Sequence, residues 1–139
     1  MSVEEKIQRM LVELRALETY YNELTTRETL VARAILDSRA TLNALKSIPE
    51  GSDSEILLPL GAGVLMRVKS PKADTLLINL GAGVVIEKNK EYVLNYLTTR
   101  ISELENALSN ISAQKTELEN KINSHRAEVN NLAASLQTG

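Results

Sequence analysis

The sequence predicts an α+β fold that is mainly α: a long antiparallel two-helix coiled coil with two tandem β-hairpins at one end, the hub end. Two segments, 2–48 and 89–138, carry apolar residues at alternating steps of three and four, the pattern of a coiled coil. The segment 54–88 between them shows the period-two alternation of strands. The chain has 139 residues, so we expect 1–139 to form one elongated unit.

Segment 2–48 predicts the first coiled-coil helix. Ser2 and Glu5 have the spacing of a capping box directly before the apolar series. Pro49 cannot continue the helix, and we expect the helix to stop there, with Gly51 just beyond. The apolar core positions are Ile7, Met10, Leu14, Leu17, Tyr21, Leu24, Val31, Ile35, Leu42 and Leu45.

Segment 89–138 repeats the pattern, with Asn89 as the expected N-cap and a core series that starts at Leu94. Two arms of nearly equal length around a compact insert favour antiparallel pairing. Residue i then faces a residue near 139 − i, and both chain ends lie together at the far tip. Glu28 and Lys115 break the two core series within about one turn of each other. Either they pair across the seam and help set the register, or each extends separately to water.

Segment 54–88 predicts two β-hairpins, each turning at a Gly-Ala-Gly sequence. The second hairpin is an internal repeat of the first, because Leu-Gly-Ala-Gly-Val occurs at 60–64 and again at 80–84. The predicted strands are 54–60, 63–69, 74–80 and 83–88.

Two hairpins on their own are marginally stable, and their apolar faces and free strand edges require partners. The sequence therefore predicts an obligate oligomer that assembles through the hairpins. The residues expected at this assembly surface are Leu58, Leu60, Gly61, Gly63, Val64, Met66, Leu76, Ile78, Leu80, Gly81, Gly83, Val84 and Ile86.

The order of elements resembles the α-class subunit of prefoldin over essentially the whole chain. The most specific part is Leu-Pro-Leu-Gly-Ala-Gly at 58–63, followed by Asn-Leu-Gly-Ala-Gly-Val at 79–84 and Glu-Lys-Asn at 87–89. The resemblance implies a hetero-hexamer of two α-class and four β-class subunits, with a double β-barrel hub and six coiled-coil tentacles. It further implies that the tentacle tips capture unfolded client proteins and transfer them to a group II chaperonin. A related filament-forming class shares the general layout.

A protein that holds unfolded chains needs exposed apolar groups, and the tip is where the seam is open-ended. Leu11 and Val12 lie off the core positions, so they widen the apolar surface there. Such binding requires no ATP, because it depends only on burial of apolar surface. The alternative for each tip residue is that it only joins the two helices. The candidate client-binding residues are Val3, Ile7, Met10, Leu11, Val12, Leu14, Val129, Leu132 and Leu136.

Composition excludes several other classes of function. The chain has no Cys and one His, which excludes thiolate chemistry and multi-His metal sites, and a net charge of −2 gives no footprint for nucleic acid. The Gly-Ala-Gly sequences lack the third glycine of a dinucleotide loop, and His125, expected to face Leu14, has a packing role. We therefore expect no catalytic, metal or cofactor site, no membrane contact and a cytoplasmic location. The alternative function is a structural coiled-coil protein, either a filament former or an adaptor.

Overall fold

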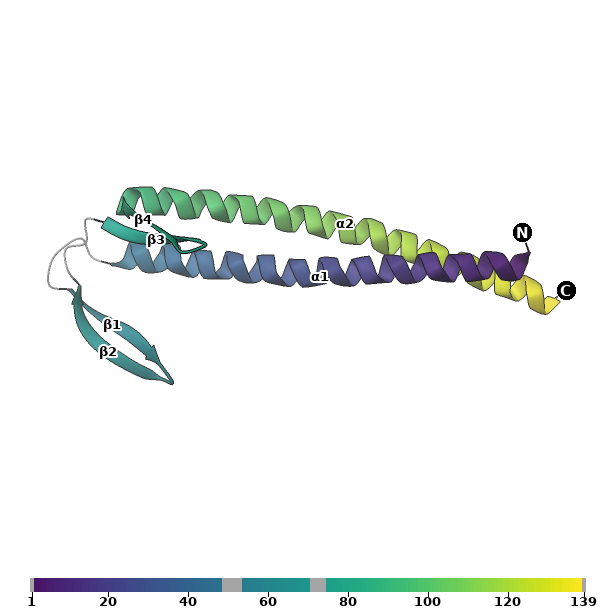
Figure 1. Cartoon of the computed structure of the whole chain (residues 1–139), viewed down its shortest axis with the longest axis horizontal. Helices are drawn as coiled ribbons and strands as arrows, with labels where there is room; N and C mark the ends of the chain where they lie inside the picture. Colours follow the sequence, from purple (N-terminus) through teal and green to yellow (C-terminus); the bar gives the residue numbers. More distant parts are fainter. Residues whose placement is uncertain (1, 49–53, 71–74, 139) are drawn as a thin grey trace. The chain divides into compact units, whose positions relative to one another are not determined.

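A computed structural model describes residues 2–48, 54–70 and 75–138. The chain contains two long helices with two small antiparallel β-hairpins between them, so the predicted α+β, mainly α fold is confirmed (Figure 1). It divides into two compact units: Met1–Ala34 with Leu104–Gly139, the coiled-coil unit, and Ile35–Glu103, the hairpin unit. In order, the elements are α1 (Val3–Ser47), β1 (Ser54–Gly61), β2 (Val64–Ser70), β3 (Thr75–Gly81), β4 (Val84–Asn89) and α2 (Lys90–Thr138).

Helix α1 begins at the predicted cap. The side-chain oxygen of Ser2 accepts a hydrogen bond from the backbone N–H of Glu5 at 3.2 Å, and the Ser2 carbonyl accepts one from Lys6 at 3.1 Å. These contacts satisfy donors that the first turn of a helix would otherwise leave unpaired. The helix ends at Ser47, and the predicted stop signals, Pro49 and Gly51, lie outside the described residues.

Helix α2 follows β4 without a loop, because Asn89 ends the strand and caps the helix. The Asn89 side-chain oxygen accepts a hydrogen bond from the backbone N–H of Tyr92 at 2.8 Å, which confirms the predicted N-cap. The buried series of α2 begins at Val93 and continues with Leu97 and Ile101, whereas Leu94 is only half-buried. Residues four apart also share a helix face, so here the buried stripe starts one residue earlier than the heptad series predicts.

The core of the coiled-coil unit is a thin layer of aliphatic side chains. Leu24 of α1 is 1% exposed, and Leu118 and Ile122 of α2 are also buried. Since the chain contains no Phe or Trp, these branched side chains fill the space between two helices rather than a thick globular core.

Polar contacts across the coiled-coil unit establish that its two helices run antiparallel. Tyr21 donates a hydrogen bond to Glu119 at 2.6 Å, and Arg126 lies 2.7 Å from Glu18. As the residue number rises on α1 it falls on α2, close to the predicted register. Figure 1 shows both chain ends at the same end of this pair of helices.

Each hairpin is a separate two-stranded antiparallel sheet, β1–β2 and β3–β4. Both sheets shift register at the same place in the repeat, between Pro59 and Gly61 and between Asn79 and Gly81. The predicted Gly-Ala-Gly turns are confirmed. The first glycine of each turn ends a strand, and the second lies in the turn rather than in the following strand.

In the described part of the chain, neither helix is apolar enough over a sufficient length to cross a membrane.

Candidate functional site: the open end of the coiled coil and the hairpin faces

The nine candidate client-binding residues lie near the helix ends of the coiled-coil unit and differ in exposure. Three are exposed: Val12 at 70%, Leu136 at 44% and Leu11 at 42%. Six are half-buried: Val3, Ile7, Met10, Leu14, Val129 and Leu132.

Burial along the seam decreases toward the chain ends. Leu24 is fully enclosed, whereas none of the nine residues nearer the ends reaches the buried class. A side chain at the end of a two-helix pair has fewer neighbours than one in its middle, so part of its surface stays in contact with water. The end of the coiled-coil unit that carries the nine candidate residues is called the open end below. It presents to water both its seam residues and the off-seam Leu11 and Val12.

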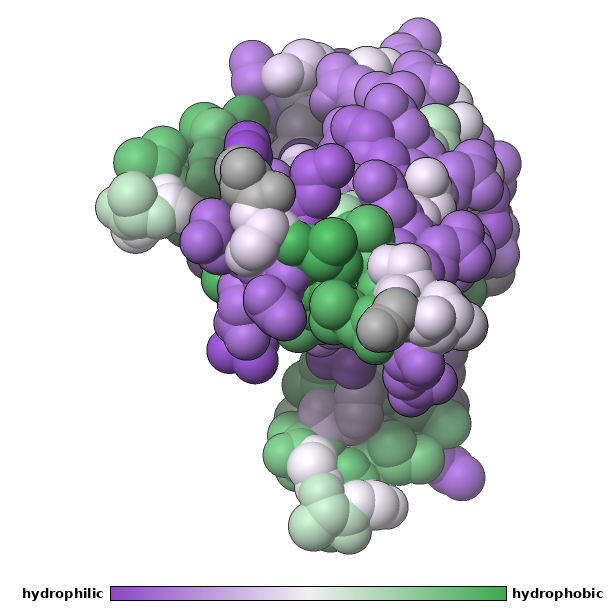
Figure 2. Space-filling view, turned by 90° about the vertical axis from the view of Figure 1, so that its right-hand side faces the viewer, coloured by the Kyte–Doolittle hydropathy of each residue, from purple (hydrophilic) through white to green (hydrophobic). Residues whose placement is uncertain are grey.

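Figure 2 views the molecule toward the end that carries both termini. It shows an apolar patch surrounded by hydrophilic surface at this end of the coiled coil, and apolar surface over the two hairpins. Exposed apolar patches rimmed by polar residues are typical of sites that bind other proteins.

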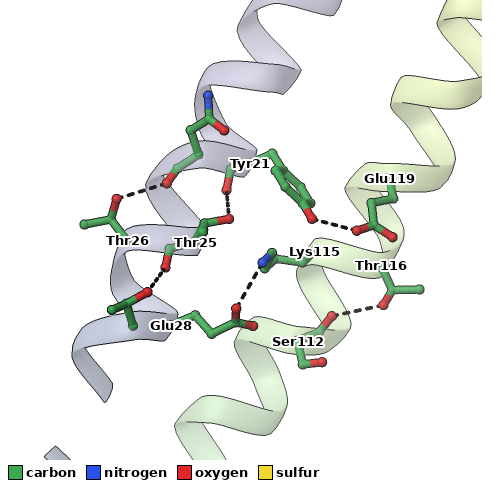
Figure 3. Close-up of polar contacts among 10 residues, drawn as sticks. Tyr21, Thr25, Thr26, Glu28, Ser112, Lys115, Thr116 and Glu119 are labelled. Carbon is green, nitrogen blue, oxygen red and sulfur yellow. Dashed lines mark hydrogen bonds and ion pairs between the residues drawn. The ribbon is translucent and has the colours of Figure 1, made fainter. Parts of the chain in front are cut away.

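A polar layer interrupts the seam farther along the coiled-coil unit (Figure 3). The Nζ atom of Lys115 lies 3.0 Å from Glu28 Oε1 and 4.8 Å from the centre of the Tyr21 ring. The Tyr21 hydroxyl in turn donates to Glu119. Four side chains from two helices therefore form one connected set of contacts, which confirms the alternative in which Glu28 and Lys115 pair.

This layer favours the protonated forms of two of its members. The hydrogen bond to the Glu28 carboxylate raises the pKa of Lys115, and the nearby carboxylate charge acts in the same direction. The hydrogen bond to the Glu119 carboxylate, followed by partial desolvation, raises the pKa of Tyr21.

His125 lies on α2 and takes part in contacts between the helices, as expected for a packing role. One ring nitrogen lies 3.2 Å from a carboxylate oxygen of Glu13, and the other lies 3.0 Å from the carbonyl oxygen of Lys121. The contact on α1 is with Glu13 rather than the predicted Leu14, a difference of one residue.

The hairpins place their candidate assembly residues on one face of each sheet. Strand alternation and the pairs Leu58–Met66 and Ile78–Ile86 define this first face. Leu58, Met66 and Val84 on it are exposed, whereas Ile78 and Ile86 are half-buried. Leu60 and Leu80 fall at the register shifts, where they have no direct partner across the sheet.

The sequence prediction missed a second apolar group on the opposite face of each hairpin. Leu57 and Leu65 of the first hairpin and Leu77 and Val85 of the second are all more than half exposed. The signal was present in the internal repeat, because each pair recurs twenty positions later. Alternation alone assigns only one face of each hairpin to a core, so it predicts no role for the other face.

The second glycine of each turn allows a backbone conformation with positive φ. Gly63 and Gly83 have φ of 79° and 78°, a conformation that glycine adopts without strain.

Among the residues described, no group of three or more His, Asp or Glu side chains could hold a metal ion.

Comparison with known proteins agrees with this architecture. The prefoldin subunit family model matches residues 3–135. The chain is 29% identical to the prefoldin subunit alpha of Nitrosopumilus maritimus over 96% of this chain and 92% of that protein. It is 30% identical to the prefoldin subunit alpha of Methanoculleus marisnigri over 77% of this chain and 76% of that one.

Two solved structures share the fold. The prefoldin beta subunit from Thermococcus strain KS-1 has a TM-score of 0.64 at 15% identity and covers 94% of both chains. The filamentous PFD of Methanocaldococcus jannaschii has a TM-score of 0.52 at 22% identity and covers 90% of this chain and 98% of that one. With a family model that spans nearly the whole sequence, and with two helices around two hairpins, the chain belongs to the prefoldin family of chaperone subunits, in its alpha class.

Proposed function

We propose that this chain is a subunit of an ATP-independent holdase that binds unfolded proteins at the open end of its coiled coil and prevents their aggregation. In this proposal the loaded clients pass to a group II chaperonin in the cytoplasm. The observation that carries it is the exposure of Leu11, Val12 and Leu136 beside the half-buried seam residues of the open end.

The chemistry of this end suits clients that differ in sequence. Burial of apolar surface is non-directional, so it does not require a matched partner. Met10 adds an unbranched side chain that adapts to different shapes. Each tip would bind weakly, and several tips on one client would raise the overall affinity by about a hundredfold or more.

The hairpins would supply the assembly that brings several tips together. Their first faces carry exposed Leu58, Met66 and Val84, and each two-stranded sheet has free edges that strands of other subunits can extend. We propose β-class prefoldin subunits as the partners, with two α-class and four β-class chains in a particle. The alpha-class membership of this chain supports that choice.

A filament former is the second candidate. It is favoured by the similarity of the fold to filamentous PFD of Methanocaldococcus jannaschii. A filament would grow from this chain alone, whereas the holdase particle requires a second kind of subunit.

The test removes the exposed apolar groups of the open end and keeps its half-buried residues. Leu11, Val12 and Leu136 are replaced by Ser in one chain, which is assembled with its β-class partners. A chemically denatured protein is then diluted into buffer, and its aggregation is followed by light scattering. We expect the variant to need roughly three to ten times more complex for half-maximal suppression, as for the loss of about a kilocalorie of binding energy.

The matched control is Leu30→Ser, because Leu30 is a leucine of α1 that is 57% exposed but lies away from the open end. Substitutions of exposed side chains change the free energy of unfolding by less than about 0.5 kcal/mol, so both variants should melt like the parent. Equal suppression by the tip variant and the parent would refute binding at the open end.

A further inference from the structure

One face at the start of α2 carries a row of aromatic and basic side chains. Side chains four residues apart on a helix lie on the same face, and the positions at this spacing are Lys88, Tyr92, Tyr96 and Arg100. Lys88 is the last residue but one of β4, and its Nζ lies 4.9 Å from the centre of the Tyr92 ring. The row, called the tyrosine row below, therefore begins at the end of β4 and continues along α2.

An open groove with a volume of about 300 Å³ follows the tyrosine row. Tyr92 is 45% exposed and Tyr96 is half-buried, so both rings present surface to water. Asn95 and Thr99 are exposed beside them and supply amide and hydroxyl groups for hydrogen bonds. The residues that line the groove are Tyr92, Asn95, Tyr96, Thr99, Arg100 and Glu103.

The two cations of the tyrosine row are not neutralised by the chain itself. Lys88 and Arg100 are exposed, and across residues 2–48, 54–70 and 75–138 neither forms an ion pair with a carboxylate. Lys88 instead lies over the Tyr92 ring, and Arg100 lies about one helical turn beyond Tyr96. Two aromatic rings therefore lie between two cations, which favours a ligand with anionic ends and an apolar centre.

The spacing of the row determines the length of the ligand. Tyr92, with Lys88 over its ring, and Arg100 are eight residues apart, or about 12 Å along the helix. A chain in the polyproline II conformation advances about 3.1 Å per residue, so two acidic residues four positions apart span this distance. The residues between them then lie over the two tyrosine rings.

Proline suits these central positions. Proline-rich segments dock in grooves lined with aromatic rings, because such segments are already extended and lose little entropy on binding. A polyproline II chain has no internal hydrogen bonds, so its carbonyl groups are free to accept them. The tyrosine hydroxyls and the side chains of Asn95 and Thr99 are donors for these carbonyl groups.

Glu103 distinguishes a short acidic peptide from a polyanion. Glu103 lines the groove about one turn beyond Arg100, so a chain whose negative charge continues past Arg100 meets a carboxylate. A single strand of nucleic acid carries a charge on every phosphate and continues in this way. The groove therefore favours a peptide whose acidic residues are limited to the two ends of the tyrosine row.

We propose that the tyrosine row is a docking site for a proline-containing acidic segment of another protein. The acidic side chains of this segment lie against the two cations, and its prolines lie against the two rings. The site belongs to the hairpin unit, whereas the candidate client-binding residues belong to the coiled-coil unit. Its occupant is a segment of defined charge and spacing, so docking is independent of client binding at the open end.

Peptide binding to the full-length chain tests the proposal. The probe is a fluorescein-labelled peptide with the core Glu-Pro-Pro-Pro-Glu, and its fluorescence anisotropy is followed as the protein concentration rises. A peptide with Lys in place of both Glu tests the charge, and a short oligothymidylate tests nucleic acid. We expect the acidic peptide to bind with a dissociation constant on the order of 100 µM, and the other two probes to bind at least about tenfold more weakly.

Substitutions in the row test which side chains bind the probe. Arg100→Glu and Lys88→Glu should each weaken binding of the acidic peptide about tenfold, and the double variant should prefer the basic peptide. Tyr92→Ser should weaken binding roughly three- to tenfold. Tyr20→Ser and Arg33→Glu are the matched controls and should bind like the parent, because both residues are exposed on α1 outside the hairpin unit, and Tyr20 is 42% exposed.

Several results would overturn the proposal. One is no binding of the acidic peptide at protein concentrations up to about 1 mM, and another is equal binding by the parent and the charge-reversed variants. A control variant that loses as much binding as Arg100→Glu would place the peptide elsewhere on the chain. Tighter binding of the oligothymidylate than of the acidic peptide would replace the proposed peptide ligand by a nucleic acid. Loss of acidic-peptide binding in the double variant without a gain for the basic peptide would contradict direct charge contacts.

Discussion

Lys115 Nζ lies 3.0 Å from Glu28 Oε1, across the seam between the two helices of the coiled-coil unit. The Lys115 side chain is 15% exposed and that of Glu28 is 34% exposed, so water reaches the pair only in part. Each charge would be costly opposite an apolar side chain, and a shift of one helix along the other would separate them. The pair therefore favours one register of the antiparallel coiled coil.

A double-mutant cycle measures this contact. We expect Glu28→Gln and Lys115→Met each to lower the melting temperature by roughly 3–6 °C, because the first leaves the Lys115 charge without its counter-charge and the second leaves the Glu28 carboxylate without its cation. The decrease in melting temperature of the double variant should be clearly smaller than the sum of the decreases of the two single variants. Thermal unfolding followed by circular dichroism gives all four values.

The pair Glu18–Arg126 is the matched control, since it also crosses between the helices but both side chains are more exposed, at 41% and 56%. Exposed pairs contribute little, so its cycle should give a coupling of no more than about 2 °C. Equal coupling in both cycles would contradict a special role for the seam pair.

Alkaline pH should destabilise this part of the protein. The folded chain raises the pKa of Lys115 above its ordinary 10.5 and that of Tyr21 above its ordinary 10.0. The folded state thus holds these two protons more tightly than the unfolded state. The associated stability is fully present below about pH 10 and is lost as the pH rises through the raised values.

The measurement is the melting temperature between pH 9 and pH 12 for the parent and for Tyr21→Phe/Lys115→Met. The parent should lose stability more steeply over this range, because only the parent carries the two groups. Parallel profiles would show that the polar layer does not contribute to the alkaline loss.

Each hairpin turn contains an alanine in a strained backbone conformation. Ala62 and Ala82 have φ of 52° and 53°, a left-handed conformation that costs an L-residue about 1–2 kcal/mol. Ala62→Gly removes the strain and loses about 0.5–1 kcal/mol of chain entropy, so we expect a small net gain in stability of β1–β2. Ala62→Val should lower that stability, because a branched side chain is worse at this φ.

Hydrogen exchange of the backbone amides measures the local stability of β1–β2 and of β3–β4 separately. Ala62→Gly should slow exchange in β1–β2 and leave β3–β4 unchanged, and Ala82→Gly should do the reverse. Faster exchange in the substituted hairpin would mean that the strain is not relieved.

Much of the fold could be predicted because its patterns are local. The heptad steps define the helices, Asn89 signals a cap by its side chain, and the Gly-Ala-Gly repeats mark both turns. Antiparallel counting also places Glu28 and Lys115 within about one turn of each other, whereas the structure was needed to show that they pair.

The remaining features depend on three-dimensional surroundings. Val93 is buried although it lies outside the heptad series, because helix neighbours four apart share a face too. Periodicity separates the off-seam Val12, which is exposed, from the core position Ile7, but how far each core side chain near the chain ends is covered depends on where the seam opens. The exposed Leu57 and Leu77 are not predicted as a surface, because antiparallel strands normally alternate between one apolar and one polar face, and these hairpins are apolar on both.

The most direct test of the holdase account is the mass and subunit content of the complex that a tagged copy of this chain recovers from its own cells. Light scattering on a sizing column, with the recovered chains identified, provides both. The account predicts a particle of roughly six chains that contains a second, smaller coiled-coil protein. A homopolymer of indefinite mass, or a simple dimer held by one dedicated partner, would contradict it.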